Sequence, residues 1–227
     1  MFFYFFFKSL DKWKGIFYNE HCSITEMSMP RKKMHVNLKA DLIKAMRTVL
    51  KVHALDGLDV RKIVKEAGCS IGTFYNNFKS LDDLVISFNG ETIDILTARL
   101  FASYNPQESA KETIRRLCLN YIAFAEENHT EWLLLLEYPI KVQPPSWYQD
   151  KVDHLFQKVC AIFHPILKGP KTDTEKAVKI LWSGLHGVCS LTLKQKLRFT
   201  KEQNTLELCQ ELFHNYILGY RIGLGIT

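Results

Sequence analysis

The chain has 227 residues and 47% of them are apolar, which is enough for a sizeable core in one large domain or in a small domain joined to a medium one. This composition disfavours an intrinsically disordered chain. With only 11 glycines and 7 prolines, the sequence has too few turn formers for many short strands, and its long periodic stretches favour an all-α fold.

The net charge of +6 is concentrated in one part of the sequence. Residues 31–80 carry 11 Lys and Arg but only 4 Asp and Glu, whereas residues 81–227 carry 16 basic and 17 acidic residues. A local basic block is typical of a phosphate-binding surface. On charge alone, a solvated basic face without a polyanionic partner is an equally good interpretation.

The chain begins with an aromatic segment, Met1 to Phe7, that is too short to span a bilayer. It also lacks the basic region, longer apolar run and small-residue cleavage site of a signal peptide. We expect residues 1–30 to be either a disordered extension or the result of a misassigned start, with Met27 or Met29 as the true first residue. No other segment suggests a membrane span, so we predict a cytoplasmic protein with no membrane partner.

The periodicity predicts helices in close succession along the first third of the chain. An amphipathic helix is expected at 37–55, and a short one at 60–67 with Asp59 as N-cap and Gly68 at its end. Ser70 caps a second short helix at 71–77, and Ser80 caps a long helix at 81–103. Two short helices around a glycine-containing turn are the signature of a helix-turn-helix, here at 59–78.

The rest of the chain predicts further helices at about 107–127, 130–141, 147–167, 172–196 and from 200 onward. Capping boxes at Thr172 and Thr200 are expected to open the last two. None of the six cysteines forms a CxxC pair or a zinc-like spacing, so no metal is predicted. Cys118, Cys160, Cys189 and Cys209 sit among apolar helix positions and are expected to be buried free thiols, with redox sensing as an open alternative.

The segment from Val60 to Leu84, VRKIVKEAGCSIGTFYNNFKSLDDL, carries a more specific pattern. Its Glu66-Ala67-Gly68, Gly72-Thr73-Phe74-Tyr75 and Phe78 resemble, in order and spacing, the DNA-binding domain of the TetR family of transcription regulators, over about residues 36–96. The resemblance implies a three-helix helix-turn-helix domain at 36–96. It also implies an α-helical ligand-binding and dimerisation domain at 97–227.

The second short helix is then the recognition helix, which presents small polar groups to phosphates and base edges. Gly72 permits close backbone approach, Thr73 suits a phosphate or a thymine methyl, and Asn76 suits adenine. By resemblance, Tyr75 gives its hydroxyl to a phosphate. Phe74 and Phe78 fit core packing better. The predicted DNA-contacting residues are Arg61, Ser70, Ile71, Gly72, Thr73, Tyr75, Asn76 and Lys79, with Lys62 as a further phosphate candidate.

Three positions depart from the family pattern. Asp59 replaces a common Thr or Ser, so it caps the helix but repels phosphate. Leu81 replaces a frequent lysine, for which Lys79 is a substitute. Ile71 stands where a basic or polar residue is common, which suggests an apolar base contact.

The resemblance implies a homodimer on an inverted-repeat operator in double-stranded DNA, and a small effector of apolar or aromatic character but unknown identity. No cofactor is expected. Helices over 174–193 and the C-terminal region have apolar stripes typical of a dimer interface, and Gly184 and Gly187 permit close helix approach; the alternative is closure of one chain's core. The predicted interface residues are Trp182, Leu185, Val188, Leu212, Phe213 and Ile217. The predicted pocket residues are Tyr121, Phe124, Trp132, Trp147 and Phe156, with His164 and His186 as polar candidates.

Two other function classes remain as alternatives. An enzyme is disfavoured because no nucleophile-elbow, zinc-protease, phosphate-loop or dinucleotide motif is present, and no catalytic residue is predicted. The nearest acid–base cluster is Glu126-Glu127 with His129, where a solvated helix end is the simpler interpretation. A helical protein-interaction module that has lost DNA binding would account for Asp59 and Leu81.

Overall fold

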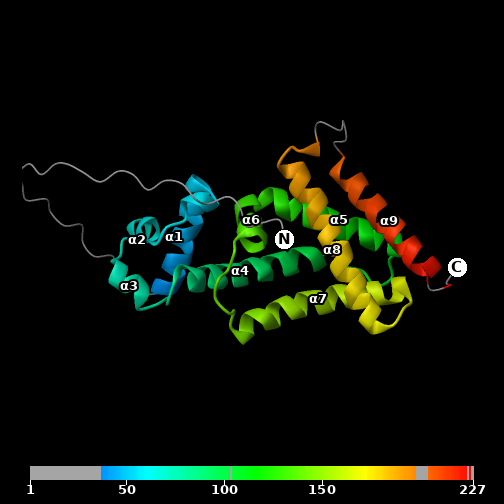
Figure 1. Ribbon diagram of the computed structural model, residues 1–227, viewed down its shortest axis with the longest axis horizontal. Coiled ribbons are helices and arrows are strands. Elements are labelled where there is room, and N and C mark those ends of the chain that lie inside the picture. Colours follow the sequence, from blue (N-terminus) through cyan, green and yellow to red (C-terminus); the bar gives the residue numbers. More distant parts are fainter. Residues whose placement is uncertain (1–36, 103, 198–203, 224, 226–227) are drawn as a thin grey trace, which may run out of the picture. The chain divides into compact units, whose positions relative to one another are not determined.

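The computed structural model describes residues 37–102, 104–197, 204–223 and 225, and within these ranges the regular elements are helices (Figure 1). The all-α prediction is therefore confirmed, while the prediction for residues 1–30 falls outside the described part. The helices are α1 Leu38–His53, η1 Leu55–Gly57 (a 3₁₀ turn), α2 Val60–Ala67, α3 Ile71–Tyr75, α4 Leu81–Phe101, α5 Ala110–Glu127, α6 His129–Glu137, α7 Ser146–Leu167, α8 Lys171–Leu193 and α9 Thr205–Gly223.

The helix starts in the first part of the fold are set by side-chain caps, as predicted. The Asp59 carboxylate accepts the Arg61 backbone N–H at 2.8 Å, and the Ser80 hydroxyl accepts that of Asp83 at 3.2 Å. Gly68 ends α2 with a φ of 70°, a left-handed conformation that other residues adopt at a cost. The tight turn between α2 and α3 therefore follows from local sequence.

Some predicted boundaries in the second part are wrong. Helix α5 begins later because Ser109 accepts the Glu112 N–H at 3.2 Å and fixes the start there. Helix α6 ends at Glu137 rather than 141. Thr172 lies inside the first turn of α8, which starts directly after Pro170. The Thr200 capping box is outside the described residues, and Asn204 instead accepts the Glu207 N–H at 3.0 Å.

Two apolar cores share the long helix α4. The first joins α1, α2, α3 and the first half of α4, and it includes Phe74 and Phe78, which confirms their predicted packing role. The second joins α5, α7, α8 and α9 to the end of α4 through Leu96 and Leu100. Because Phe74 is fully buried, its truncation to alanine would cost about 3 to 5 kcal/mol of folding free energy.

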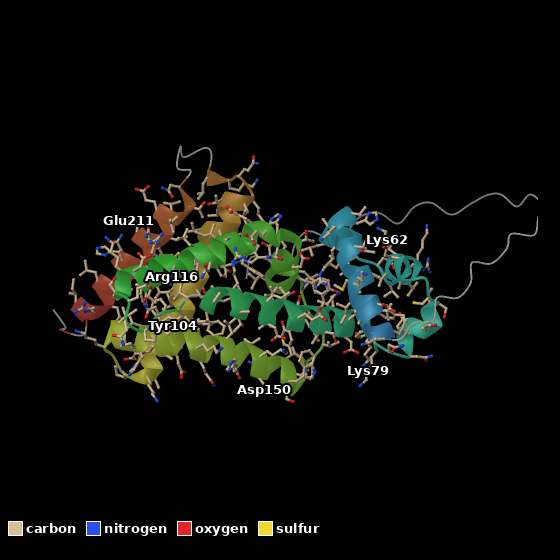
Figure 2. The ribbon with its side chains drawn as sticks, turned by 180° about the vertical axis from the view of Figure 1, so that it is seen from behind. Lys62, Lys79, Tyr104, Arg116, Asp150 and Glu211 are labelled. Carbon is tan, nitrogen blue, oxygen red and sulfur yellow. The ribbon has the colours of Figure 1, made fainter. Side chains whose placement is uncertain are left out.

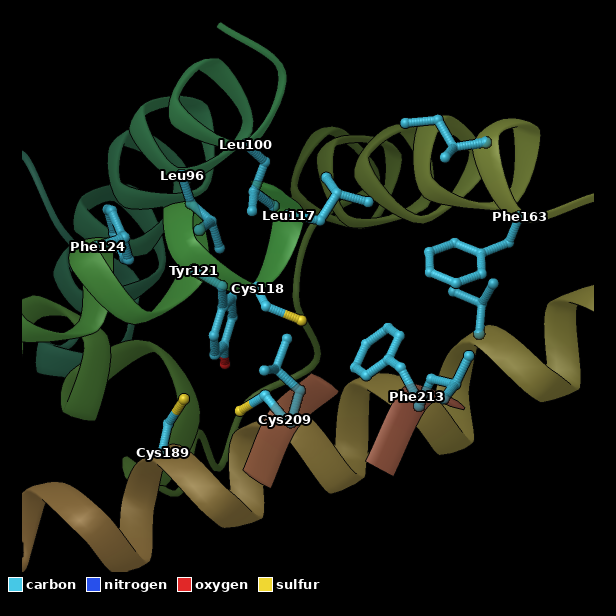
Figure 3. Packing of buried hydrophobic residues seen from close by; sticks show 14 of the residues in the cluster. Leu96, Leu100, Leu117, Cys118, Tyr121, Phe124, Phe163, Cys189, Cys209 and Phe213 are labelled. Atoms are coloured by element: carbon cyan, nitrogen blue, oxygen red, sulfur yellow. The ribbon is translucent and has the colours of Figure 1, made fainter. Parts of the chain in front are cut away.

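The second core contains three cysteines from different helices. Figure 3 shows Cys118 of α5, Cys189 of α8 and Cys209 of α9 with their sulfur atoms directed into the same region, and all three are buried free thiols. Burial, with a smaller contribution from Cys209, raises the pKa of Cys118 to about 12. The Cys189–Cys209 hydrogen bond lowers the pKa of Cys209 and raises that of Cys189. The prediction of buried free thiols is confirmed for these three, but it is wrong for Cys160, which is only partly buried on α7.

Candidate functional site

The exposed face of α3 is anchored by aromatic side chains on its opposite face. Phe74 is fully buried and packs edge-on against Tyr75, with ring centroids 5.2 Å apart. Ile71 and Tyr75 are 45% and 55% exposed, which is unusual for large apolar and aromatic side chains. The buried anchor fixes the orientation of the short helix, so these side chains are presented outward on a rigid support.

Two hydroxyl groups meet at the start of α3. The Ser70 Oγ accepts the Thr73 backbone N–H at 3.1 Å and lies 2.7 Å from the Thr73 Oγ1. Whichever hydroxyl donates within this pair, the proton of the other stays free to donate elsewhere. The pair therefore combines a helix cap with a donor suited to a phosphate oxygen.

The basic candidates differ in their surroundings. The Lys62 Nζ donates to the Gly57 carbonyl at 3.0 Å and thereby braces the turn before α2. Arg61 and Lys79 are exposed, as are Gly72 and Asn76. Figure 2 labels Lys62, which lies on α2, and Lys79, which lies in the segment between α3 and α4.

Two of the three positions that depart from the family pattern have structural explanations. Asp59 is used as a helix cap, as predicted from its type and position. Leu81 is partly buried against the first core, so an apolar residue there adds to packing at the start of α4. Both changes therefore support the local fold.

An apolar cavity of about 210 Å³ lies within the second core. Its lining consists of aliphatic and aromatic side chains from α4 to α9. These are Ile93, Leu96, Leu100, Leu117, Tyr121, Leu135, Leu136, Tyr148, Val152, Leu155, Phe156, Val159, Phe163, Val178, Leu181, Trp182, Leu185 and Phe213. Such a lining suits a small apolar molecule.

The five predicted pocket residues divide into three groups. Tyr121 and Phe156 line the cavity. Phe124 and Trp132 are buried in the surrounding core without lining it. Trp147 is 42% exposed and packs against α4 at Gly90, where a Cβ would approach its ring to 2.8 Å. The sequence did not distinguish cavity-lining aromatic residues from plain core residues because both kinds recur at helical spacing.

Polar groups gather around Tyr121. Its hydroxyl accepts the Trp132 Nε1–H at 3.2 Å and lies 3.5 Å from the His186 Nδ1. Burial lowers the pKa of His186, which favours its neutral form, and raises the pKa of Tyr121. His164 is instead engaged with the Thr174 hydroxyl at 3.2 Å. Of the two histidine candidates, His186 is thus the one beside a cavity-lining group.

Helix α6 belongs to both cores. Leu134 is fully buried in the first core, together with residues of α1, α2 and α3. Leu135 and Leu136, the next two residues, line the cavity. A displacement of α6 caused by occupancy of the cavity would therefore act directly on the packing beneath the helix-turn-helix.

A hydrogen-bonded latch joins the end of α6 to the start of α4. The Asp82 carboxylate, which is 8% exposed, accepts the Tyr138 hydroxyl at 2.9 Å and the Lys141 backbone N–H at 2.9 Å. Burial and the adjacent Asp82 together raise the pKa of Tyr138 to about 12. Because Asp82 lies only a few residues after α3, this latch holds the segment between α3 and α4 against the end of α6.

An arginine of α1 makes a second connection. Arg47 pairs with Glu91 of α4 at 3.4 Å and with Glu131 of α6 at 3.6 Å. Its guanidinium also stands over the Phe88 ring, 4.9 Å from the centroid. Neither connection has a local sequence signal, because each joins residues far apart in the chain.

The structure places the predicted dimer residues mainly inward. Trp182, Leu185 and Phe213 line the cavity of a single chain. Val188, Leu212 and Ile217 are partly buried against the second core. Gly184 does permit close helix approach, since a Cβ there would lie 2.6 Å from a Leu212 methyl, but this contact is between α8 and α9 of the same chain.

A different set of apolar residues on these two helices faces outward. Ile180 and Leu191 of α8 are 45% and 46% exposed, and Leu218 and Ile222 of α9 are 50% and 67% exposed. Gly187 lies between the two α8 residues, and a Cβ there would contact nothing within 4 Å. We call Ile180, Leu191, Leu218 and Ile222 the outer apolar stripe.

The acid–base cluster near the end of α5 is engaged in surface interactions. Glu127 pairs with Arg99 at 2.8 Å, and the His129 ring stacks on Trp132. Within the described ranges, no group of His, Cys, Asp and Glu is arranged to hold a metal ion. A search of the described helices likewise finds none with the length and hydropathy of a membrane span.

Two family models match the chain in the order expected for one architecture. The model for bacterial regulatory proteins of the tetR family matches residues 42–88, which contain the helix-turn-helix. The model for the tetracyclin repressor-like C-terminal domain matches residues 114–215, which contain most of the cavity lining. No curated protein matches the chain.

Solved structures show the same fold at low sequence identity. A protein of unknown function from Rhodococcus sp. RHA1 has a TM-score of 0.66 and 19% identity over 84% of this chain and 98% of its own. A TetR-like transcriptional regulator from the same organism has a TM-score of 0.55 and 17% identity, covering 87% and 99% of the two chains. The multidrug binding protein EbrR, solved with imidazole, has a TM-score of 0.54 and 18% identity, covering 80% and 96%.

The family models cover both the helix-turn-helix and the cavity-bearing region, and the fold agrees with them. This chain belongs to the TetR family and is a DNA-binding transcription regulator.

Proposed function

We propose that the protein is a ligand-responsive repressor, which binds an inverted-repeat operator as a homodimer and is released when a small apolar molecule enters the cavity. The observation that carries this proposal is the position of α6, which buries Leu134 in the first core and lines the cavity with Leu135 and Leu136. The cavity and the DNA-binding surface thus share a structural element.

On DNA, α3 would lie in the major groove. Ile71 and Gly72 on this helix, and Asn76 at its C-cap, are exposed and available for base contacts. Tyr75, Lys79, Arg61 and the hydroxyl pair of Ser70 and Thr73 would contact phosphates. Burial of Phe74 supports this assignment because it holds the remaining face of α3 against the protein.

A ligand in the cavity would act through the relative positions of α4 and α6. Both helices line the cavity, and the Asp82–Tyr138 latch joins them next to α3. A shift of α6 would therefore move the start of α4 and change the separation of the two recognition helices in a dimer. Couplings of this kind need only about 1 to 3 kcal/mol of difference in ligand affinity between the two states.

The outer apolar stripe supports self-association. Four large apolar side chains are exposed on α8 and α9, two helices that pack against each other, and apolar side chains exposed together mark interaction sites. The open space at Gly187 would admit a helix of a second copy. We expect the double variant Leu218→Glu, Ile222→Glu to sediment as a monomer, whereas Val142→Glu, on an exposed loop, should leave the wild-type mass unchanged. Wild-type protein that sediments as a monomer would contradict the dimer.

Binding of DNA is tested by selection from a random-sequence library with the full chain. The expected product is an inverted repeat with half-sites about one helical turn apart. Tyr75→Phe should weaken binding about tenfold or more, because a hydrogen bond to a charged phosphate is lost. The matched variant Tyr104→Phe, between α4 and α5, should bind as wild type. Failure to enrich any sequence would refute the regulator assignment of α3.

A further inference from the structure

Ile71 is a large apolar side chain on the exposed surface of the recognition helix. It is 45% exposed and is not a member of either apolar core. It is the first residue of α3 and lies one helical turn before Tyr75, so the two exposed side chains share one side of the helix. Packing within the chain therefore does not account for an isoleucine at this position.

The next residue, Gly72, indicates that another molecule comes close to this surface. Apart from its chain neighbours and the backbone of its own helix, the described residues would place only the Ser70 Oγ within 4 Å of a Cβ at Gly72, at an ordinary contact distance of 3.8 Å. The chain itself would thus admit alanine here, which is the better helix former. A missing side chain is useful where an outside surface must approach the backbone. Ile71 stands beside this point of approach.

The chemistry of Ile71 selects among the four bases. In the major groove, thymine presents a C5 methyl group, whereas cytosine, adenine and guanine present only hydrogen-bonding groups. Isoleucine cannot replace the hydrogen bonds that such groups lose when they are removed from water. Residues at the start of a recognition helix contact base edges, and Ile71 holds that position in α3. A thymine methyl is thus the base feature that matches this side chain.

We infer that Ile71 contacts the C5 methyl of a thymine in each operator half-site and thereby determines part of the operator sequence. This inference rests on the proposed binding of α3 in the major groove. On an inverted repeat, a dimer makes the contact twice, at two thymines related by symmetry. Burial of one methyl group strengthens binding about fourfold, so the two contacts together contribute about 15-fold.

The test removes the methyl group alone from the DNA. In the operator selected with the full chain, each symmetric pair of thymines is replaced in turn by deoxyuridine, and affinity is measured by fluorescence anisotropy. We expect one pair whose replacement weakens the wild type about 15-fold. Ile71→Ala should bind the thymine and deoxyuridine operators within about twofold of each other. Ile95→Ala changes an isoleucine of α4 that is 49% exposed and should keep the wild-type ratio.

A second substitution in the DNA restores the methyl group on a different base. Cytosine in place of the contacted thymine, paired with guanine, should weaken the wild type, and 5-methylcytosine should recover part of that loss because its methyl group occupies the same place in the groove. For Ile71→Ala, 5-methylcytosine should have no advantage over cytosine. The melting temperature of free Ile71→Ala should stay within about 2 °C of the wild type, which separates a base contact from an effect on folding.

The outcomes distinguish this inference from the proposed function. A selected operator in which every thymine tolerates deoxyuridine would overturn the role of Ile71 and leave operator binding intact. The same loss on methyl removal in Ile71→Ala as in the wild type would also overturn it. Failure to select any sequence would refute the proposed function, and this inference with it.

Discussion

The latch between Asp82 and Tyr138 connects α4 to α6. Its contribution to the free energy of unfolding follows from the geometry of its hydrogen bonds. The Tyr138 hydroxyl donates to a carboxylate that is nearly buried, and the carboxylate keeps one other partner, the Lys141 N–H. Tyr138→Phe removes that donor and changes little else. A hydrogen bond to a charged group contributes about 1.5 to 3 kcal/mol, and partial exposure of Tyr138 favours the lower end.

We therefore expect Tyr138→Phe to lower the free energy of unfolding by about 1.5 kcal/mol, which corresponds to a fall in melting temperature of roughly 3 to 6 °C for a chain of this size. Circular dichroism measures both. Tyr104→Phe is the matched control, because Tyr104 is 43% exposed, and it should change stability by less than about 0.5 kcal/mol.

A double-mutant cycle separates the latch from other effects of the two side chains. Asp82→Ala, Tyr138→Phe and the double variant should give a coupling energy of about 1 to 1.5 kcal/mol. Additive effects within about 0.3 kcal/mol, or a Tyr138→Phe variant as stable as the control, would refute the argument that this hydrogen bond ties α6 to the start of α4.

Three further predictions concern the shared helix and the buried ionisable groups. Leu134→Ala should destabilise the protein by about 2 to 5 kcal/mol in urea unfolding, since Leu134 is fully buried in the first core; a loss below about 1 kcal/mol would contradict its place there. Burial lowers the pKa of His186 below 6.5, so the unfolded chain takes up a proton first and stability falls as pH drops below about 6.5. The melting temperature of His186→Gln should therefore fall less between pH 7.5 and 5.5 than that of the wild type, and equal slopes would count against a neutral His186. Finally, because its pKa is about 12 and it is buried, Cys118 should resist iodoacetamide at pH 8 in the folded protein and react after unfolding, as read by peptide mass spectrometry; rapid labelling of the native state would contradict this.

Local signals account for what could be predicted from the sequence. Asp59, Gly68, Ser70 and Ser80 fix helix ends through their own backbone neighbours, so a short stretch of sequence contains the whole cause. The buried position of Phe74 likewise follows from the pattern of the helix-turn-helix. The start of α8 predicted at Thr172 is wrong. Thr172 has the residue type of a helix cap, but Pro170 takes the cap position and the helix begins at Lys171.

The regulatory region was harder to predict because α8 and α9 are apolar on more than one face. Periodicity identifies an apolar face but does not tell whether a cavity, the chain's own core or a second copy covers it. Periodicity therefore assigns Trp182 and Phe213 to a dimer interface, and in the structure both line the cavity. Periodicity does not single out Ile180 and Leu218, which are exposed.

Binding of operator DNA by the α2–α3 surface can be measured through the salt dependence of affinity for the selected operator. The wild type should lose affinity steeply with salt, and Lys79→Gln should reduce the slope of log Kobs against log[salt] by about 2, one phosphate contact from each protomer of a dimer. Lys176→Gln, an exposed lysine of α8, should leave the slope unchanged. Equal binding of selected and scrambled DNA by the wild type, with the same salt slope in Lys79→Gln, would contradict operator binding by the α2–α3 surface.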